Sequence, residues 1–508
     1  MRTLLFQLVA PVAATTLACQ SASTTSSTEM PEAETPPNVV LILADDLGWG
    51  ELGSYGQQKI RTPNLDRLAT EGLRFTQCYS GAPVCAPCRN VLMTGRHLGH
   101  VTIRGNKPAT DENGKRVEGQ HPIPAAALTI AEVFQANGYA TGGFGKWGLG
   151  PVGSTGDPNA QGFDRFFGYN CQRVAHSYYP PHLWSDAEKV VINTSPIPGH
   201  AKRPEGEITF ADWSSENYAP DLILSEAVQF LDDHKDEPFF LYLPFVEPHV
   251  AMQPPQSHVE SYPEEWDDRP YRGQCGYTPH PRPRAGYAAM ITDLDEHVGT
   301  ILSKLEALGL EDDTLVIFTS DNGTTHRSGG DKVLGVGGVD ADFFNSTGGL
   351  RGFKGSVYEG GLRVPMIARW PGVVPKDAVT DQPTYFPDLF PTLCNVMGAD
   401  VPDGLDGDSI ETALYGEGIL ASRKPMVWTF VEYGGQVALR LGDWKVVQRG
   451  LKRKNGQPDP WEVYDLAGDP GESTNLAADH PELIDEAREI LRREMDDNPI
   501  FPLSVPGV

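Results

Sequence analysis

The stretch Asn38-Val39-Val40-Leu41-Ile42-Leu43-Ala44, followed at once by Asp45-Asp46, decides the fold. A short, continuous run of β-branched and aliphatic residues is typical of a strand that is buried on both faces of a parallel sheet. The two aspartates then lie at the carboxyl end of the strand, where open α/β sheets bind their ligands. We therefore predict that Asp45 and Asp46 belong to a functional site.

The same pattern occurs twice more along the chain. Residues 314–320 form an apolar run that ends on Asp321-Asn322, and residues 239–246 form one that ends on Glu247-Pro248-His249. Helical patterns lie between these runs, at residues 65–71, 129–137, 221–234, 285–308 and 387–397. Alternating strands and helices predict an α/β fold with a large, mostly parallel sheet between layers of helices.

The pattern changes in two places. From about residue 150 to 220 the chain is rich in Pro, Gly, Tyr and His with little periodicity, which predicts long loops that recognise the substrate. After about Asp406, short alternating segments and a helix from about residue 481 to 495 predict a small antiparallel sheet with a closing helix. We predict a large domain over residues 37–405 and a C-terminal subdomain over residues 406–508.

The first 36 residues are predicted to stand outside the fold. Met1-Arg2 and the apolar stretch that runs to Val12 have the character of a secretory signal. Residues 16–19 resemble a bacterial lipobox, so we weigh lipidation of Cys19 equally against simple secretion. A spacer rich in Ser, Thr, Glu and Pro follows. We expect an exported protein that is periplasmic, secreted or held at the cell surface.

Charge and cysteine content narrow the function. The formal net charge of −27 argues against nucleic acid as a partner, because phosphate binding needs a basic surface. An anionic substrate would need cations gathered in the site itself. The seven cysteines are too few and too scattered for a disulfide framework, although one or two disulfides remain open.

A signature lies about forty residues after the first aspartates. Cys85-Ala86-Pro87-Cys88-Arg89, with Thr94-Gly95 downstream, resembles the sequence by which type I sulfatases present a cysteine for oxidation to formylglycine. Further family motifs follow in order: Gly145-Lys146-Trp147, Pro248-His249, Asp321-Asn322-Gly323, Lys354 with Glu359-Gly360-Gly361, and Arg363-Val364-Pro365. The resemblance covers nearly everything from Asn38 onward. It implies an alkaline phosphatase-like fold and a sulfuric ester hydrolase.

The predicted metal site consists of oxygen ligands. Asp45, Asp46, Asp321 and Asn322 suit a hard cation, with Ca²⁺ as the first choice and Mg²⁺ as the alternative. The resemblance adds residue 85 to this group as formylglycine, whose hydrate would attack the sulfur atom.

The resemblance also implies roles for four basic residues. Arg89, one helical turn from residue 85, would hold that residue and offset charge. Lys146 and Lys354 would clamp sulfate oxygens, and His249 would give a proton to the leaving alcohol.

The sequence departs from the family at two positions. Gly148 stands where the family commonly has a histidine that contacts the formylglycine, and His176 or His326 are the candidates to replace it as a base. Cys88 creates a Cys-Ala-Pro-Cys that also resembles a thioredoxin-like redox motif, although no thioredoxin domain surrounds it.

Substrate contacts are less well defined by the sequence. Arg104 and Asn106 are candidates because they lie just past the signature. The aromatic stretch at residues 178–184 could stack on sugar rings, and core packing explains it equally well.

Three functions follow from these observations. The first is hydrolysis of a sulfated carbohydrate or aryl sulfate, which requires a formylglycine-generating enzyme or similar maturase as a partner. The second is hydrolysis of phosphodiesters or phosphonate monoesters in the same superfamily. The third is a catalytically impaired relative that only binds sulfated glycans, which the glycine at 148 suggests.

Overall fold

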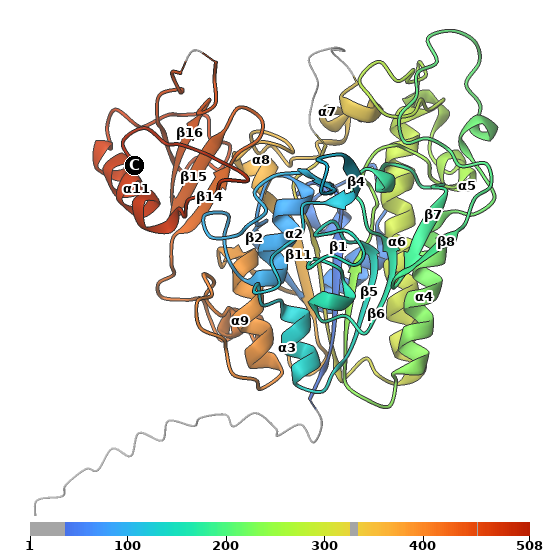
Figure 1. Ribbon diagram of the computed structural model, residues 1–508, viewed down its shortest axis with the longest axis horizontal. Helices are drawn as coiled ribbons and strands as arrows, with labels where there is room; N and C mark the ends of the chain where they lie inside the picture. The colour runs from blue at the N-terminus through green and yellow to red at the C-terminus, as the bar shows by residue number, and fades with distance from the viewer. Residues whose placement is uncertain (1–35, 326–333, 455) are drawn as a thin grey trace, which may run out of the picture. The chain divides into compact units, whose positions relative to one another are not determined.

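The first predicted strand is β1 (Asn38–Ala44), and it lies within the large sheet of the protein (Figure 1). It pairs in parallel with β10 (Thr314–Ser320) on one side and with β9 (Phe239–Pro244) on the other. The strand β5 (Ala140–Lys146) pairs in parallel with β9. The carboxyl ends of these four strands therefore lie at one edge of the sheet.

The computed structural model describes residues 36–325, 334–454 and 456–508. Within them the large sheet has eleven strands, of which ten follow the order β12-β2-β11-β10-β1-β9-β5-β6-β7-β8 and β13 pairs with β2. The other strands of the sheet are β2 (Leu73–Tyr79), β6 (Arg165–Tyr169), β7 (His182–Ser185), β8 (Glu188–Val191), β11 (Arg363–Arg369), β12 (Ala378–Thr380) and β13 (Thr384–Tyr385). Antiparallel pairs are β10 with β11, β11 with β2, β6 with β7 and β7 with β8.

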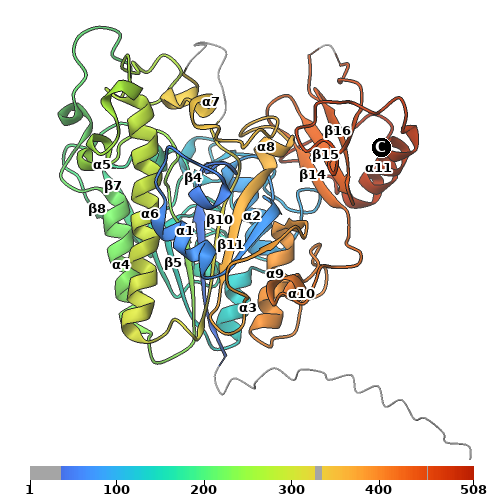
Figure 2. The same cartoon turned by 180° about the vertical axis from the view of Figure 1, so that it is seen from behind.

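Helices cover both faces of this sheet because alternate residues of β1 point to opposite sides. Val39, Leu41 and Leu43 join a core with α2 (Cys85–Thr94), α3 (Ile130–Ala136) and α9 (Phe386–Val396). The intervening residues join a second core with α1 (Pro63–Thr70), α4 (Ala219–Asp233) and α6 (Pro283–Leu308). Figures 1 and 2 show these two layers from opposite sides.

A second, antiparallel sheet follows near the C-terminus. Its strands are β14 (Met426–Phe430), β15 (Gln436–Leu441), β16 (Trp444–Arg449) and β17 (Glu462–Asp465), and α11 (Pro481–Glu494) packs against it. The remaining elements are the hairpin of β3 (Pro108–Thr110) and β4 (Arg116–Gln120) and the short helices α5 (Gln256–Glu260), α7 (Ala341–Phe344), α8 (Glu359–Leu362) and α10 (Glu411–Leu414).

The predicted fold class is confirmed, and most predicted elements lie within a few residues of their observed positions. The prediction of irregular loops over residues 150–220 is wrong in part, because β6, β7 and β8 extend the large sheet there. In the sheet, β6 pairs with β7, and β7 pairs with β8. The sequence did not reveal these short strands, because the loops that join them have an irregular composition. The boundary between Leu405 and Asp406 stays a prediction.

Three further predictions concern the N-terminal segment, the cysteines and the absence of a membrane-spanning helix. The secretory signal, the lipobox with Cys19 and most of the spacer lie outside the described residues. All six cysteines in the described ranges are free thiols. Among the helices described, none combines the length and the apolar character that crossing a membrane requires.

Candidate active site

The ends of two neighbouring strands place four oxygen-bearing side chains together. Asp45 and Asp46 follow β1, and Asp321 and Asn322 follow β10. The backbone N–H of Asp321 donates to the carbonyl of Ala44 (3.0 Å), and that of Asp46 donates to Asp321 Oδ1 (3.2 Å). Asp46 has a φ of 68°, so the chain turns sharply straight after the strand. All four side chains are fully buried.

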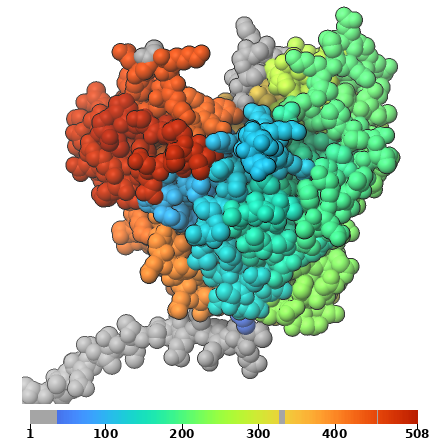
Figure 3. All heavy atoms as spheres, viewed as in Figure 1, coloured from blue at the N-terminus to red at the C-terminus, as the bar shows by residue number. Residues whose placement is uncertain are grey.

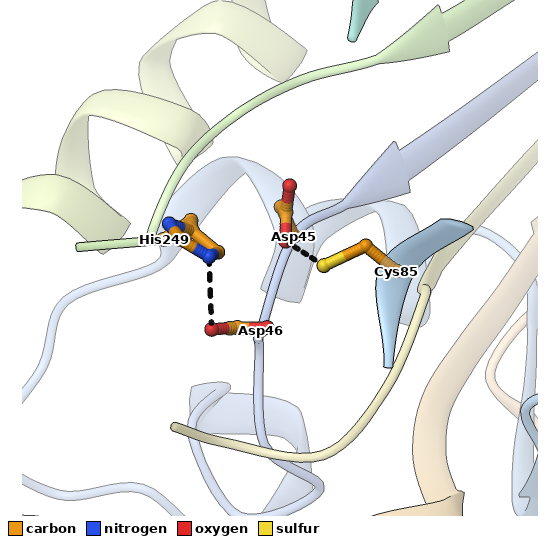
Figure 4. Close-up of side chains that lie close together, drawn as sticks. All are labelled: Asp45, Asp46, Cys85 and His249. Carbon is orange, nitrogen blue, oxygen red and sulfur yellow. Dashed lines mark hydrogen bonds and ion pairs between the residues drawn. The ribbon is translucent and has the colours of Figure 1, made fainter. Parts of the chain in front are cut away.

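Helix α2 brings Cys85 and Arg89 to these carboxylates. The helix begins at Cys85 and ends at Thr94, because the next residue, Gly95, has a left-handed conformation that stops it. Cys85 Sγ lies 3.3 Å from Asp45 Oδ1, as Figure 4 shows. One turn later, Arg89 Nη2 lies 2.8 Å from Asp321 Oδ2 and 3.2 Å from Asp45 Oδ2. The guanidinium therefore ties both strand ends to the helix.

Two lysines complete the charged part of the site. Lys146, the last residue of β5, forms an ion pair with Asp45. Lys354 Nζ lies 2.6 Å from Asp46 Oδ1 and 3.5 Å from Cys85 Sγ. Each lysine is thus held on a carboxylate beside residue 85.

His249 faces the same group of residues. Its Nδ1 donates to the carbonyl of Val250 (2.5 Å), and its Nε2 lies 3.7 Å from Asp46 Oδ2 (Figure 4). The ring of His176 stacks on it, with centroids 4.9 Å apart. Burial and then the positive charge of Lys354 lower the pKa of His249 well below its ordinary value. The imidazole is therefore neutral at pH 7 in the free protein.

The four strand-end residues fit a hard cation. The Oδ1 atom of Asn322 is buried and has no hydrogen-bond partner, while Nδ2 of the same amide donates to Asp46 Oδ1 (2.7 Å). Oxygen atoms from three carboxylates and one amide are the donor set that calcium and magnesium prefer. The ligand atoms of Asp45, Asp46, Cys85 and His249 also lie within 4.8 Å of one another. The orphaned amide oxygen is the atom that a cation would satisfy.

The carboxylates of the cluster repel one another, so positive charge stabilises them. Burial, followed by the charge of Asp45, raises the pKa of Asp321 to about 6. Burial alone would raise the pKa of Asp45 as well, but Lys146 and its other cationic neighbours hold it well below its usual range. A bound cation would relieve the repulsion that Asp321 experiences.

The two cysteines of the signature have thiols of raised pKa. Burial, followed by the charges of Asp321 and Asp45, raises the pKa of Cys85. Burial also raises the pKa of Cys88, whose side chain packs in the core between α2 and the sheet. Redox motifs need an accessible thiolate of low pKa. The structure therefore gives no support to thioredoxin-like chemistry at these residues.

A cavity of about 270 Å³ opens above Cys85. In the described part of the chain it is lined by Cys85, Asn106, Pro108, Arg116, Gln120, Lys146, Gln172, Arg173, His176, His249, Tyr277, Thr325, Lys354 and Tyr433. Six of the predicted site residues are among them: Cys85, Asn106, Lys146, His176, His249 and Lys354. Beneath the lining, Asp45 contacts Cys85 and Lys146, Asp46 contacts Lys354, and Arg89 donates to the carbonyl of Lys146.

Not every predicted residue reaches this cavity. Arg104 is buried elsewhere, where its guanidinium donates to the carbonyls of Val101 and Gly99 and to the carbonyl of Asp496 (3.0 Å). We therefore correct its prediction as a substrate contact. His326 lies outside the described residues. The hydroxyl of Tyr178 lies 2.7 Å from the carbonyl of His249, so core packing explains this aromatic residue.

Gln172 occupies the space beside Gly148, the position where the sequence departs from the family. A Cβ added to Gly148 would lie 1.9 Å from Gln172 Nε2, and the φ of Gly148 is 83°. Gln172 is buried, and neither atom of its side-chain amide has a hydrogen-bond partner. His176 pairs instead with His200 (2.8 Å between Nδ1 and Nε2). Its role as a base stays a prediction.

The sequence reasoning missed Gln172, Arg116, Arg173, Tyr277 and Tyr433. Each lies in a loop or short strand far along the chain from the signature, and none belongs to a motif. Only Gln172 had a signal in the sequence, because the glycine at position 148 leaves space that another side chain must fill.

Comparison with known protein families gives matches over most of the chain. The family model described as "Sulfatase" matches residues 37–399. A second, described as "N-sulphoglucosamine sulphohydrolase, C-terminal", matches residues 352–498. Together they span the large sheet and the C-terminal sheet.

Individual relatives agree with the family models. Arylsulfatase A of Homo sapiens is 34% identical over 509 residues, covering 91% of this chain and 88% of that protein. N-acetylgalactosamine-6-O-sulfatase of Bacteroides thetaiotaomicron is 31% identical, covering 90% and 92%. The solved structure titled "Crystal structure of Ps i-CgsB in complex with k-i-k-neocarrahexaose" has a TM-score of 0.72 at 26% identity, covering 91% of this chain and 93% of its own.

Proposed function

The chain belongs to the sulfatase family of sulfuric ester hydrolases, and we propose that it removes sulfate from a sulfated carbohydrate or an aryl sulfate. The proposal includes a formylglycine made from Cys85 and a divalent cation held by Asp45, Asp46, Asp321 and Asn322. Calcium is the first choice, with magnesium as the alternative. The names of the N-acetylgalactosamine-6-O-sulfatase and of the neocarrahexaose complex favour a carbohydrate substrate.

One observation carries the proposal. Residues from six separate parts of the chain meet at one cavity or directly beneath it: the ends of β1, β5 and β10, the start of α2, the loop after β9, and the loop before α8 that carries Lys354. The orphaned oxygen of Asn322 lies in this group. A structural core does not require so many buried charges at one point, because burying each charge costs free energy unless it is paired.

A hydrated formylglycine offers an oxygen nucleophile for the sulfur atom, and a divalent cation beside it polarises a sulfate oxygen and offsets negative charge. The donor atoms of the four strand-end residues would hold the cation.

The remaining steps belong to side chains that the structure describes. Lys146 and Lys354 can exchange their carboxylate partners for sulfate oxygens and stabilise the charge that develops there. Arg89 keeps Asp45 and Asp321 in place. His249 would bring a proton to the leaving alcohol through Nε2, because Nδ1 is fixed by the carbonyl of Val250.

The first experiment determines the state of residue 85. The protein is produced with a formylglycine-generating enzyme, and the tryptic peptide Phe75–Arg89 is analysed by mass spectrometry for loss of the thiol and gain of an aldehyde. The same preparation is assayed for sulfate release from 4-nitrophenyl sulfate and a panel of sulfated saccharides, with Cys85→Ala as the control. A fully modified protein that releases sulfate from none of these compounds would falsify the proposed function.

The two alternatives remain distinguishable by chemistry. The phosphodiester and phosphonate alternative predicts faster turnover of a phosphorus ester than of the sulfate ester with the same 4-nitrophenyl leaving group. The glycan-binding alternative, which rests on Gly148, predicts saccharide binding without sulfate release from a fully modified protein.

We also propose an exported location, in the periplasm, at the cell surface or in the medium, with a maturase as a partner in the cell. The proposal rests on the N-terminal sequence. Cell fractionation tests the location, and incorporation of labelled fatty acid into wild type but not Cys19→Ala tests the lipid anchor. Recovery of the protein only in the cytoplasm would contradict it.

A further inference from the structure

Two arginines line the cavity and have no role in the proposed reaction. Arg116 lies on β4 and Arg173 immediately precedes the short 3-10 helix Val174–His176. In the space-filling view the segment that contains β3 and β4 stands out on the surface (Figure 3). Both arginine side chains are exposed to solvent. They are therefore open to a ligand that enters the cavity.

The two guanidinium groups have no partner in the described part of the protein. Neither forms a hydrogen bond or an ion pair there, although the chain carries 68 acidic residues against 41 Lys and Arg. The other two cations of the cavity, Lys146 and Lys354, are already paired with Asp45 and Asp46. The described lining contains no Asp or Glu. The cavity is thus a cationic pocket in an acidic protein.

We propose that Arg116 and Arg173 bind a second anionic group of the substrate, next to the sulfate that is removed. A planar guanidinium matches the paired oxygens of a carboxylate or a sulfate and holds them in fixed geometry. The inference rests on the proposed function. It narrows the substrate to a saccharide that carries a uronate carboxylate or a second sulfate.

Gln172 supports a saccharide as the carrier of that group. Its side-chain amide is buried against Gly148, and the residue precedes Arg173 in the sequence. Neither polar atom of this amide has a hydrogen-bond partner. A buried amide without partners is costly, and ring hydroxyl groups can both donate to it and accept from it. The cavity thus offers an amide for the sugar ring and guanidinium groups for its charge.

Binding measurements on the Cys85→Ala variant in calcium test this inference without turnover. Isothermal titration calorimetry compares N-acetylgalactosamine 6-sulfate with two larger anions, N-acetylgalactosamine 4,6-disulfate and the uronate-containing disaccharide of the 6-sulfate. N-acetylglucosamine 6-sulfate and its corresponding disulfate and uronate disaccharide form a second set. We expect at least one dianion to bind roughly 10- to 100-fold more tightly than its monosulfate, as charged hydrogen bonds suggest.

Substitution assigns that gain to the arginines. In Arg116→Gln/Arg173→Gln the advantage of the dianion should fall to less than about threefold, while binding of the monosulfate stays the same. Lys235→Gln/Arg493→Gln, at two exposed positions away from the cavity, controls for the loss of two positive charges. Preference for the disulfate or for the uronate distinguishes the two sources of the anion.

Three results overturn the inference: no dianion binds better than its monosulfate, no compound binds, or the advantage persists in the double variant. In modified wild type the same substitutions should lower kcat/KM for the preferred saccharide and leave kcat/KM for 4-nitrophenyl sulfate within about twofold. If modified wild type releases no sulfate from any compound, the proposed function fails, and the binding data still decide the role of the arginines.

Discussion

The side chain of His249 shows how one residue sets the reaction that the site can perform. Its Nδ1 is occupied by the carbonyl of Val250, so proton transfer is left to Nε2, which faces Asp46 and the cavity. Burial, followed by the nearby cations, lowers its pKa, which makes the protonated ring a stronger acid. A leaving alcohol of high pKa needs that proton, whereas nitrophenolate leaves without it.

His249→Ala should therefore discriminate between leaving groups. We expect kcat for a sulfated saccharide to fall by roughly 10²- to 10⁴-fold, and kcat for 4-nitrophenyl sulfate to fall much less. Steady-state kinetics on both substrates measure the difference, and His234→Ala on the surface serves as the control. An equal loss on both substrates would show that His249 acts by binding rather than by proton donation.

The same histidine predicts the pH dependence of the wild-type enzyme. The acid must carry a proton, and its pKa lies below 6.5 in the free enzyme. Since the protonated fraction decreases as pH rises through that pKa, kcat/KM for a saccharide should decrease on the alkaline side of an acidic optimum. A pH profile of kcat/KM checks this sign. A value that rises from pH 5 to pH 7 would contradict it.

Gly148 and Gln172 are predicted to be coupled. Gly148→Ala places a Cβ in a left-handed backbone conformation and 1.9 Å from Gln172 Nε2, so we expect a loss of about 1 to 3 kcal/mol in the free energy of unfolding. Gln172→Ala removes the clash but not the backbone strain. Urea unfolding of both single variants and the double variant should show that the double loses less than the sum of the singles. Additive losses would mean that the two residues do not share this space.

At the scale of elements, the site depends on where strands end. The apolar runs before Asp45 and Asp321 were sufficient to predict two buried parallel strands, because each run is short and rich in β-branched residues, which favours a strand over a buried helix. Cys85 and Arg89 were predicted from a motif, and the helix that carries them places both on the carboxylates.

Other parts of the site had no local signal in the sequence. Arg116, Gln172 and Arg173 lie on a hairpin and in a loop whose positions depend on the edge strands β6, β7 and β8. Those short strands read as irregular because they contain few consecutive apolar residues. The prediction for Arg104 was wrong because it relied on closeness to the signature in sequence, which does not place a side chain in the cavity.

Helix α6 holds the loop that carries His249. His297 Nδ1 lies 3.1 Å from Glu247 Oε1, and the carbonyl of Glu247 accepts from the backbone N–H of Asp45 (3.0 Å). Glu247 is fully buried, so His297→Leu leaves its carboxylate without a cation. We expect a loss of about 3 to 5 kcal/mol in the free energy of unfolding. Urea unfolding measures it, and adding Glu247→Gln should restore part of the loss. A loss below about 1 kcal/mol would show that the pair does not anchor the loop.

At the scale of the whole molecule, a cation bound at the strand ends should stabilise the folded protein. A ligand that binds only the folded state at 100 times its Kd stabilises by about 2.7 kcal/mol. After treatment with a chelator, the protein should unfold at a lower temperature, and calcium should restore it more effectively than magnesium. Asn322→Leu should weaken the effect, because it removes the orphaned oxygen. Differential scanning calorimetry checks both, and an unchanged Tm would exclude cation binding under those conditions.

The two sheets are joined by a buried charge cluster. Lys445 of β16 lies 2.8 Å from Glu359 Oε1, at the start of α8, and 3.0 Å from Glu472 Oε1. All three residues are fully buried. Burial and the nearby Glu359 raise the pKa of Glu472 to about 7, against the attraction of Lys445. The folded protein therefore binds more protons than the unfolded chain between pH 4.5 and pH 7, and stability from this group decreases as pH rises through that range.

Lys445→Met should make that pH dependence steeper. Without the ammonium group, two buried carboxylates repel each other once they are ionised, so the free energy of unfolding should fall by about 3 to 5 kcal/mol at pH 8 and by clearly less at pH 5, where one carboxylate can remain protonated. Urea unfolding at the two pH values measures the difference, with the exposed Lys452→Met as the control. Because Glu359 follows the loop of Lys354, activity should fall with stability at pH 8. Equal destabilisation at both pH values would mean that Lys445 contributes packing rather than charge.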